Sequence, residues 1–374
     1  MQVTCVLKST ASTALRRRLR ETCFLSSGLS SGYKRSSVQT SFLKGLDAVL
    51  YPGACRLASL SRKPERELSG KPLILRPGGL GDLICADIAL QELSLEAREF
   101  TWLIEGRSKP WAEFRGLPHL CYEEKPLKTL GEVRGRYALV MNTEQLFGLA
   151  EAYALLARAK DGRLVSFATN RGASWSDVVV SYDWRDRHET IEFARLFAVA
   201  LGLPEPSGLR LPRPRREPPS APPLVAIAGR QSPSRRLSID AWTALITKWH
   251  QKRPFLIAAA PEDTEFAGQL THRFEGQAAR FEGTFGELCG QIARSEEIFT
   301  MDGGAVHIAS YFGVPTLAVF TSGRDRKWHP FGEGSRILRR HDLTCQPCTK
   351  FGQVPPCPYG YACLELEDVA ATKV

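Results

Sequence analysis

The stretch LILRPGGLGDLICADIAL, at residues 73–90, decides our prediction of the fold. It predicts a short buried strand, a glycine-rich turn and then an apolar helix. Gly78, Gly79 and Gly81 allow unusual backbone angles and the close approach of a ligand. Asp82 falls in the first turn of the helix, beside backbone N–H groups that have no partner within the helix. A helix cap is the ordinary role of an aspartate there, and a chemical role is the alternative.

Short apolar runs alternate with helical patterns on both sides of this stretch. We expect strands at residues 73–75, 100–104, 138–141, 164–167, 178–180, 224–228, 255–260, 298–301 and 316–320. We expect helices at residues 83–93, 146–159, 190–201, 239–250, 262–274, 285–293 and 305–312. Strands that alternate with helices predict an α/β fold, with a parallel sheet and helices on both of its faces.

A chain of 374 residues is too long for one ordinary core, so two domains of about 150 residues are expected. Residues 203–223 hold eight prolines and predict a stiff linker between two βα domains of similar size. A ligand cleft between the domains follows from this arrangement. The predicted segments are a basic arm, partly helical or disordered, at 1–70, an N-terminal Rossmann-like domain at 71–202, the linker, a C-terminal Rossmann-like domain at 224–340 and a cysteine-rich segment at 341–374.

The net charge of +10 is placed unevenly. Residues 1–70 contain twelve Lys or Arg and four Asp or Glu, a net charge of +8, whereas the other 304 residues carry only +2. This distribution does not suggest a basic nucleic-acid groove through the folded body. The hydrophobic content of 43% and the charged content of 24% are typical of a soluble globular protein.

The basic arm has three interpretations. Its Ser, Arg and Leu content resembles an organellar transit peptide. A start codon assigned upstream of the true one is another explanation. We favour an arm that rests on an anionic membrane surface, because one helical face gathers apolar side chains before Pro52 and Gly53 break the helix. These side chains are Phe42, Leu43, Leu46, Val49 and Leu50.

The most informative stretch of the second half is IFTMDGGAVHIASYFGVPTLAVF, at residues 298–320. A strand leads into Asp302, Gly303 and Gly304, and a helix follows. The two glycines leave backbone N–H groups bare at the start of this helix, which is a ready anion site. Asp302 either caps the helix or binds a hydroxyl group, and His307 lies one turn further on. A tight turn with a structural histidine remains open as the alternative.

These residues carry a resemblance to a known family. Residues 302–309, followed by G-x-P-T, resemble the D-[TS]-G-x-x-H-[LI]-A signature of glycosyltransferase family 9, the bacterial heptosyltransferases of lipopolysaccharide core assembly. Residues 76–82 are similar to the family's R-x-x-x-L-G-D loop. Residues 281–295 resemble the helix L-x-x-x-I-x-x-[AS] that precedes the signature.

A fourth element resembles the family with substitutions. Residues 225–242 follow its pattern of a strand, a polar loop and K-x-W-P-x-x-x-[FW], but Arg235 replaces the Lys and Leu237 the Trp. Gly303 likewise stands where the signature has Thr or Ser. The four motifs lie in register over residues 72–370.

The resemblance implies a GT-B fold, in which two Rossmann-like domains have parallel sheets facing across a cleft. It also implies inverting transfer without a metal, with a nucleotide-sugar donor bound mainly by the C-terminal domain. The donor-binding residues it implies are Arg230, Gln231, Arg235, Asp263, Asp302, Gly303, Gly304 and His307. Among these, Asp263 would bind the ribose, although Glu262 and Glu265 are close. Helix N–H groups and an arginine can stabilise a leaving diphosphate without Mg²⁺.

Asp82 takes the role of general base in this interpretation. Inverting transfer needs one carboxylate to accept the proton of the acceptor hydroxyl as that hydroxyl attacks the anomeric carbon. Because the diphosphates have a better site in the second half, Gly79 and Gly81 form an acceptor-side loop that lets this hydroxyl approach Asp82.

Four cysteines near the end form a separate cluster. Their spacing is Cys345-x₂-Cys348-x₈-Cys357-x₅-Cys363, which is compatible with a structural zinc or iron site but lacks a second C-x₂-C. Reduced thiols in an irregular tail are the alternative. No cofactor is expected to be required for catalysis.

The sequence therefore predicts a heptosyltransferase-like enzyme that uses a nucleotide-sugar such as ADP-heptose. The expected acceptor is a lipid-linked or anionic glycan of the cell envelope, such as lipopolysaccharide, and no nucleic acid is expected to bind. We expect a cytoplasmic protein, peripheral on the inner face of the bacterial inner membrane. The alternatives are a non-catalytic nucleotide-sugar or glycan binding protein on the same scaffold, supported by the substitutions above, and a nucleotide-sugar epimerase.

Two smaller motifs complete the candidates. His188 and Glu189 open a predicted helix, where capping is the ordinary role. Residues 327–330, KWHP, follow a predicted strand and form either a loop that closes over the donor or an ordinary solvated loop.

Overall fold

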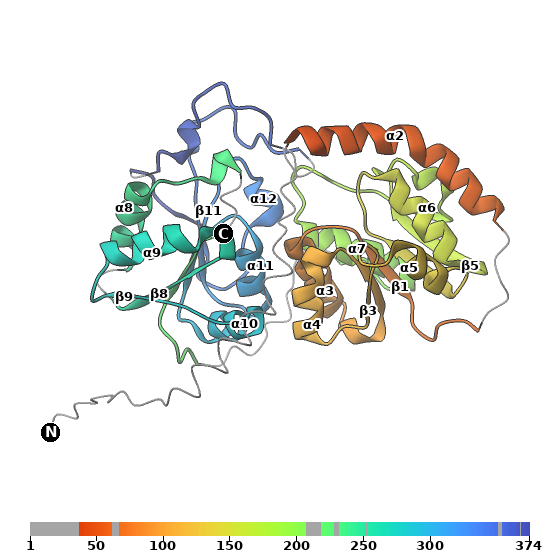
Figure 1. The fold of residues 1–374 in the computed structure, drawn as a ribbon, viewed down its shortest axis with the longest axis horizontal. Coiled ribbons are helices and arrows are strands. Elements are labelled where there is room, and N and C mark those ends of the chain that lie inside the picture. Colours follow the sequence, from red (N-terminus) through yellow and green to blue (C-terminus); the bar gives the residue numbers. More distant parts are fainter. Residues whose placement is uncertain are drawn as a thin grey trace, which may run out of the picture.

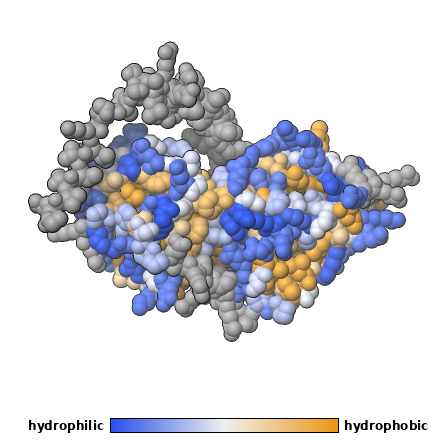
Figure 2. Space-filling view, turned by 90° about the horizontal axis from the view of Figure 1, so that it is seen from below, coloured by the Kyte–Doolittle hydropathy of each residue, from blue (hydrophilic) through white to orange (hydrophobic). Residues whose placement is uncertain are grey.

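The two βα halves form two lobes that lie side by side in the computed structural model (Figure 1). The structure describes residues 37–61, 67–206, 218–227, 232–250, 253–350, 354–366 and 368–374. The N-terminal lobe runs to residue 206 and the C-terminal lobe begins at residue 218. Hydrophilic and hydrophobic side chains are mixed over both lobes when the molecule is seen from below (Figure 2). No helix within the described ranges has the length and apolar character needed to cross a membrane.

The N-terminal lobe is built on a parallel sheet of six strands. Its order is β3-β2-β1-β4-β5-β6. The strands are β1 (Leu73–Arg76), β2 (Thr101–Ile104), β3 (His119–Cys121), β4 (Tyr137–Asn142), β5 (Arg158–Phe167) and β6 (Val178–Val180). All four residues of β1 are buried, as the unbroken apolar run predicts for a central parallel strand.

The C-terminal lobe repeats this order with one additional strand. The order is β13-β12-β11-β10-β7-β8-β9. The strands are β7 (Leu224–Ile227), β8 (Phe255–Ala259), β9 (Ala278–Arg280), β10 (Ile298–Met301), β11 (Thr316–Val319), β12 (Arg336–Leu338) and β13 (Thr372–Lys373). Only β13 is antiparallel to its neighbour. In each sheet the order in which successive strands are added reverses once, between β1 and β4 in the first sheet and between β7 and β10 in the second. This is the Rossmann arrangement.

Helices cover the faces of both sheets. They are α2 (Ser37–Leu60), α3 (Leu80–Glu92), α4 (Lys109–Arg115), α5 (Pro126–Val133), α6 (Gly148–Ala157) and α7 (Glu189–Leu201) in the N-terminal lobe. The C-terminal lobe has α8 (Ile239–His250), α9 (Thr264–Arg273), α10 (Phe285–Arg294), α11 (Gly304–Tyr311) and α12 (Asp325–Trp328). The predicted α/β class is confirmed. The prediction missed α4, α5, α12, β3, β9, β12 and β13, which are short elements whose apolar periods are too brief to detect.

The first helix is longer than predicted. Pro52 was expected to end it, but α2 continues through Pro52 to Leu60. Pro52 and Ala48 are both exposed, so the carbonyl that loses its partner at the proline faces water. Contacts with α6 on both sides of the proline hold the helix together. The side chains of Phe42 and Leu43 lie outside the described residues.

The end of the predicted linker belongs to the C-terminal lobe. Ala221 forms a parallel bridge with Ser295, and the Pro223 carbonyl accepts a hydrogen bond from Leu256 N. The end of this segment therefore contacts the C-terminal lobe through an isolated bridge, outside the named strands of the sheet. Ser220 and Ala221 interrupt the prolines and supply the N–H donors that proline lacks.

An apolar contact joins the two lobes beneath the predicted site. Trp111 of α4 meets Tyr311 of α11 edge to face with ring centroids 4.9 Å apart. Phe114 and Phe312 form a second pair at 6.3 Å. Arg115 lies over the Tyr311 ring and also pairs with buried Asp87. Such packing favours one orientation of the two lobes.

Candidate active site

The predicted site residues lie at the carboxyl ends of parallel strands. Arg76 ends β1 and Asn142 ends β4, on either side of the reversal in the first sheet. Asp302 follows β10, beside the reversal in the second sheet, and Asp263 follows β8. Ligands of open α/β sheets bind outside the carboxyl ends of the strands at such reversals. Both lobes therefore present candidate residues where the fold places ligand sites.

Asp82 caps its own helix and remains partly accessible. Its Oδ2 accepts a hydrogen bond of 2.9 Å from the N–H of Gly79, the residue that caps α3. Its Oδ1 lies 3.0 Å from Nη2 of Arg76. The side chain is still 24% exposed, while that of Arg76 is 3% exposed. The cap and a chemical role are compatible, because each oxygen keeps a lone pair available.

Arg76 is a buried cation that holds Asp82 in place. Its Nη1 donates to the Thr143 carbonyl at 2.8 Å. A side chain at Gly78 would meet the guanidinium, since a Cβ atom there would lie 2.2 Å from Nη2. Burial acts to lower the pKa of Arg76, but the nearby carboxylates, Asp82 foremost, outweigh it and raise this pKa. Gly78 is therefore needed for the Arg76–Asp82 pair.

Glu144 is a second buried carboxyl group near this pair, and sequence reasoning missed it. Its Oε1 accepts hydrogen bonds from the N–H groups of Leu146 and Phe147. The pKa of Glu144 is raised to about 7, chiefly by burial; Asp82 also acts to raise it, while Arg76 and the two backbone N–H groups act to lower it. No motif marked this residue, because only the packing of β4 beside β1 brings it to Arg76.

We expect Glu144 to make stability depend on pH. Because its pKa is raised from 4.5 to about 7 in the folded protein, the fold favours the protonated form. The free energy of unfolding should therefore fall as the pH rises from about 4.5 to about 7, by on the order of 3 kcal/mol, and then level off. Urea unfolding of the wild type and of Glu144→Gln across this range measures the effect. Glu144→Gln should lose this pH dependence of the free energy of unfolding. Glu99→Gln, at an exposed site, should keep it.

In the C-terminal lobe Asp302 forms an ion pair with an arginine side chain and does not cap α11. Its Oδ2 lies 2.8 Å from Nη2 of Arg235, at the end of a 3₁₀ turn (Pro233–Arg235). A Cβ atom at Gly323 would lie 2.1 Å from the same oxygen, so glycine is required there. The residue that caps α11 is Gly303, without a side-chain hydrogen bond. Because glycine has no side chain, Gly303 cannot accept a hydrogen bond from the N–H groups in the first turn of α11.

His307 joins the two lobes. Its Nδ1 lies 3.4 Å from Sγ of Cys85 on α3. A Cβ atom at Gly81 would lie 2.6 Å from its ring, so Gly81 makes room for the histidine. Burial lowers the pKa of His307, while Asp302 and Asp82 both act in the opposite direction. His307 therefore lies near the carboxylates of both lobes.

The remaining predicted donor residues are placed in part. Asp263 ends a 3₁₀ turn (Pro261–Asp263) and is buried, whereas Glu262 and Glu265 are exposed. Gly304 begins α11 close to Leu80 of the N-terminal lobe. Arg230 and Gln231 lie outside the described residues.

The four predicted cysteines line one pocket, together with Ser234 and Ser322. Among the described residues, no three His, Cys, Asp or Glu side chains are grouped closely enough to hold an ion. The segment instead supports the loop beside Asp302. Gln346 donates to the Thr321 carbonyl and Thr349 to the Ser322 carbonyl. A structural metal at these cysteines stays a prediction.

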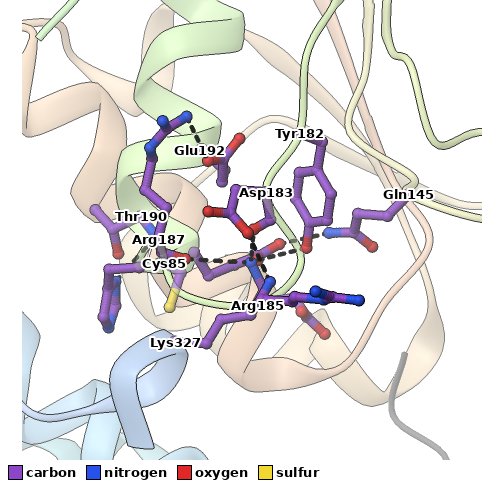
Figure 3. A network of polar contacts seen from close by, with 12 residues as sticks. Cys85, Gln145, Tyr182, Asp183, Arg185, Arg187, Thr190, Glu192 and Lys327 are labelled. Carbon is purple, nitrogen blue, oxygen red and sulfur yellow. Dashed lines mark hydrogen bonds and ion pairs between the residues drawn. The ribbon is translucent and has the colours of Figure 1, made fainter. Parts of the chain in front are cut away.

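A buried ion pair across the lobes was also missed. Lys327 of α12 lies 2.7 Å from Glu189 of α7, and their side chains are 5% and 0% exposed. Glu189 also accepts hydrogen bonds from Tyr182 and Gln145. Figure 3 shows Lys327, Tyr182 and Gln145 as parts of this polar network. Gln145 in turn contacts Arg76, so a polar chain leads from Lys327 to Asp82.

The structure also decides two smaller expectations. Lys327 is buried, so its loop is not an ordinary solvated one. His188 caps α7 as predicted, since its Nδ1 accepts a hydrogen bond from Thr190 N. Its Nε2 donates to the His329 carbonyl of the other lobe. His188 and Glu189 of the N-terminal lobe therefore both contact residues of the C-terminal lobe.

The sequence model of glycosyltransferase family 9 (heptosyltransferase) matches residues 130–357. The chain belongs to this family. It is therefore a glycosyltransferase, and the predicted resemblance is confirmed. No curated protein matches the chain.

Solved structures similar to this family 9 enzyme have the same fold. Heptosyltransferase WaaC of E. coli, solved with ADP, is 16% identical with a TM-score of 0.57, covering 71% of this chain and 92% of that one. A family 9 glycosyltransferase of Veillonella parvula is 15% identical at 0.57, covering 74% and 88%. ADP-heptose lps heptosyltransferase II of E. coli is 14% identical at 0.55, covering 73% and 91%. The predicted GT-B fold is confirmed.

Proposed function

We propose that this glycosyltransferase moves a sugar from a nucleoside diphosphate donor to a glycan hydroxyl with inversion, using Asp82 as the base. The observation that carries the proposal is the position of His307. This ring contacts α3 of the N-terminal lobe and lies near both Asp82 and the Asp302–Arg235 pair. Asp82 of one lobe and the Asp302–Arg235 pair of the other both lie near this ring, which supports a base and a donor site that act together.

Asp82 is suited to accept the acceptor proton. The acceptor oxygen forms a bond to the anomeric carbon while the bond from that carbon to the diphosphate oxygen breaks, and its electron pair leaves with the nucleotide. The proton of the hydroxyl passes to the Asp82 carboxylate. Arg76 and the Gly79 N–H orient the carboxylate for this transfer. Gly79 leaves room for the acceptor, whereas Gly81 is occupied by packing against His307.

The leaving diphosphate meets positive charge in the C-terminal lobe. The bare N–H groups at Gly303 and Gly304 and the positive end of the α11 dipole stabilise an anion. Nε of Arg235 is buried and has no hydrogen-bond partner within the described residues, so it can donate to a phosphate oxygen. These groups can neutralise the charge by themselves, which supports transfer that does not require a metal.

The donor we propose is ADP-heptose, and the acceptor is a lipid-linked or anionic envelope glycan. The ADP in the WaaC structure and the name of heptosyltransferase II support this donor. A panel of nucleotide-sugars, assayed for transfer with and without EDTA, tests the proposal. We expect turnover with ADP-heptose that EDTA does not reduce, and inversion at the anomeric carbon by NMR. Turnover only with another nucleotide-sugar would contradict the proposed donor. Loss of turnover in EDTA would contradict transfer without a metal.

Arg235→Ala is expected to weaken ADP binding by about ten- to a hundredfold, because a charge-assisted hydrogen bond contributes about 1.5–3 kcal/mol. Arg235→Lys should lose less affinity for ADP, since lysine keeps the positive charge but cannot form the two parallel hydrogen bonds of a guanidinium. Isothermal titration calorimetry with ADP measures both. Arg273→Ala is the matched control, because this arginine pairs with Asp240 on the surface and is 54% exposed. An unchanged affinity for Arg235→Ala would remove this residue from the donor site.

A further inference from the structure

The outer face of α2 is apolar. Val49, Leu57 and Leu60 are 76%, 73% and 73% exposed, and Leu46 and Leu50 are 41% and 47% exposed. These residues follow helical spacing and form one stripe, which we call the outer stripe of α2. Between residues 45 and 60 the only charged residues are Asp47, which is buried, and Arg56. A helix face with several exposed aliphatic side chains and a single charge is typical of an interaction surface.

The inner face of α2 is fully engaged, so the stripe is not an undocked core face. Asp47 accepts hydrogen bonds from the N–H groups of Gly148 and Leu149 at the start of α6. Arg171 pairs with Asp47 at 3.0 Å. Tyr51 packs against Gly148, where a Cβ atom would clash with its ring. The helix lies along the upper surface of the N-terminal lobe, over α6 (Figure 1). Its larger aliphatic side chains are exposed to solvent.

Positive charge flanks the stripe on both sides in the sequence. Residues 1–36 contain seven Lys or Arg and one Glu, a net charge of +6. Arg62, Lys63 and Arg66 follow the helix, with Glu65 among them. A second copy of this chain would bring the same cationic segments together and be repelled. An anionic lipid surface offers both the complementary charge and an apolar interior.

We propose that the outer stripe of α2 inserts into the surface of an anionic lipid membrane. The helix lies in the plane of the membrane and does not cross it. Its attachment to α6 through Asp47 then fixes the N-terminal lobe relative to the bilayer. The proposal does not depend on which sugar is transferred.

Sedimentation of the full chain with vesicles tests this proposal. We expect binding to vesicles of phosphatidylglycerol and phosphatidylcholine to be at least about tenfold tighter than to phosphatidylcholine alone, and to weaken as salt screens the charges. The triple variant Val49→Ser/Leu57→Ser/Leu60→Ser should bind the anionic vesicles at least about tenfold more weakly. Leu127→Ser is the matched control, because Leu127 is 86% exposed on α5 of the same lobe, and it should bind as the wild type does.

The melting temperature shows whether the variant is folded. It should stay unchanged, because the three side chains make no core contact; should it fall, Leu57→Ser alone makes the same comparison. Binding of the folded variant as tight as that of the wild type would overturn the proposal. So would equal binding to neutral vesicles. The wild type could instead fail to bind vesicles and form a dimer in sedimentation velocity. If the triple variant then stayed a monomer, the stripe would be an interface with a second copy of the chain.

Discussion

Asp82→Asn is expected to lower kcat of sugar transfer by about 10²–10⁴-fold, the usual contribution of a general base. The amide keeps the shape of the side chain and can still accept the hydrogen bond from Gly79 N, but it cannot take a proton. The KM for the donor should change little, because the proposed phosphate contacts come from the other lobe. Steady-state kinetics with saturating acceptor measure both constants.

Asp161→Asn is the control for this prediction, because Asp161 is an exposed aspartate of the same lobe. It should keep the wild-type kcat. A kcat of Asp82→Asn within about twofold of the wild type would rule out Asp82 as the base, and Asp82 would then serve only as the cap of α3.

Lys327→Met is expected to lower the free energy of unfolding by about 3–5 kcal/mol, the typical cost of removing one partner of a buried ion pair. Glu189 is fully buried and would keep Tyr182 and Gln145 as donors but lose its cation. Urea unfolding measures the change. Because Lys327 belongs to the C-terminal lobe and Glu189 to the N-terminal one, the two lobes should also unfold less cooperatively.

The double variant Lys327→Met/Glu189→Gln distinguishes a buried charge from simple loss of packing. It should recover part of the stability, because no uncompensated charge then remains. Arg326→Ala is the matched control: Arg326 also contacts the other lobe, at Asp186, but the two side chains are 75% and 63% exposed. This surface pair should cost less than about 1 kcal/mol. Equal losses for Arg326→Ala and Lys327→Met would refute the role of burial.

The ordering of the elements could be predicted from local patterns, and several candidate site residues could be selected in the same way. Alternating apolar runs revealed most strands and helices, because periodicity reflects burial along one element. Asp82, Asp302 and His307 were found because glycine-rich turns at helix starts are local signals. Local signals also misled: Pro52 was expected to end α2, but packing on α6 carries the helix through.

Partners from different elements could not be predicted. Nothing near Gly81 in the sequence indicates that His307 fills the space beside it, and Gly323 lies over Asp302 from another loop. Glu144 belongs to no motif, and the motifs that contain Glu189 and Lys327 do not indicate that these two residues pair. Their burial depends on how β4 lies beside β1 and how the two lobes meet.

The sequence by itself determined the α/β class, the family and the identity of the Asp82 loop, since these depend on residue order and spacing within one segment. Only the tertiary structure decided that Arg76 holds Asp82, that Lys327 and Glu189 join the lobes, and that α2 turns its aliphatic side chains outward. The physical reason is that burial and charge pairing depend on which surfaces meet, and residues far apart in the chain form those surfaces.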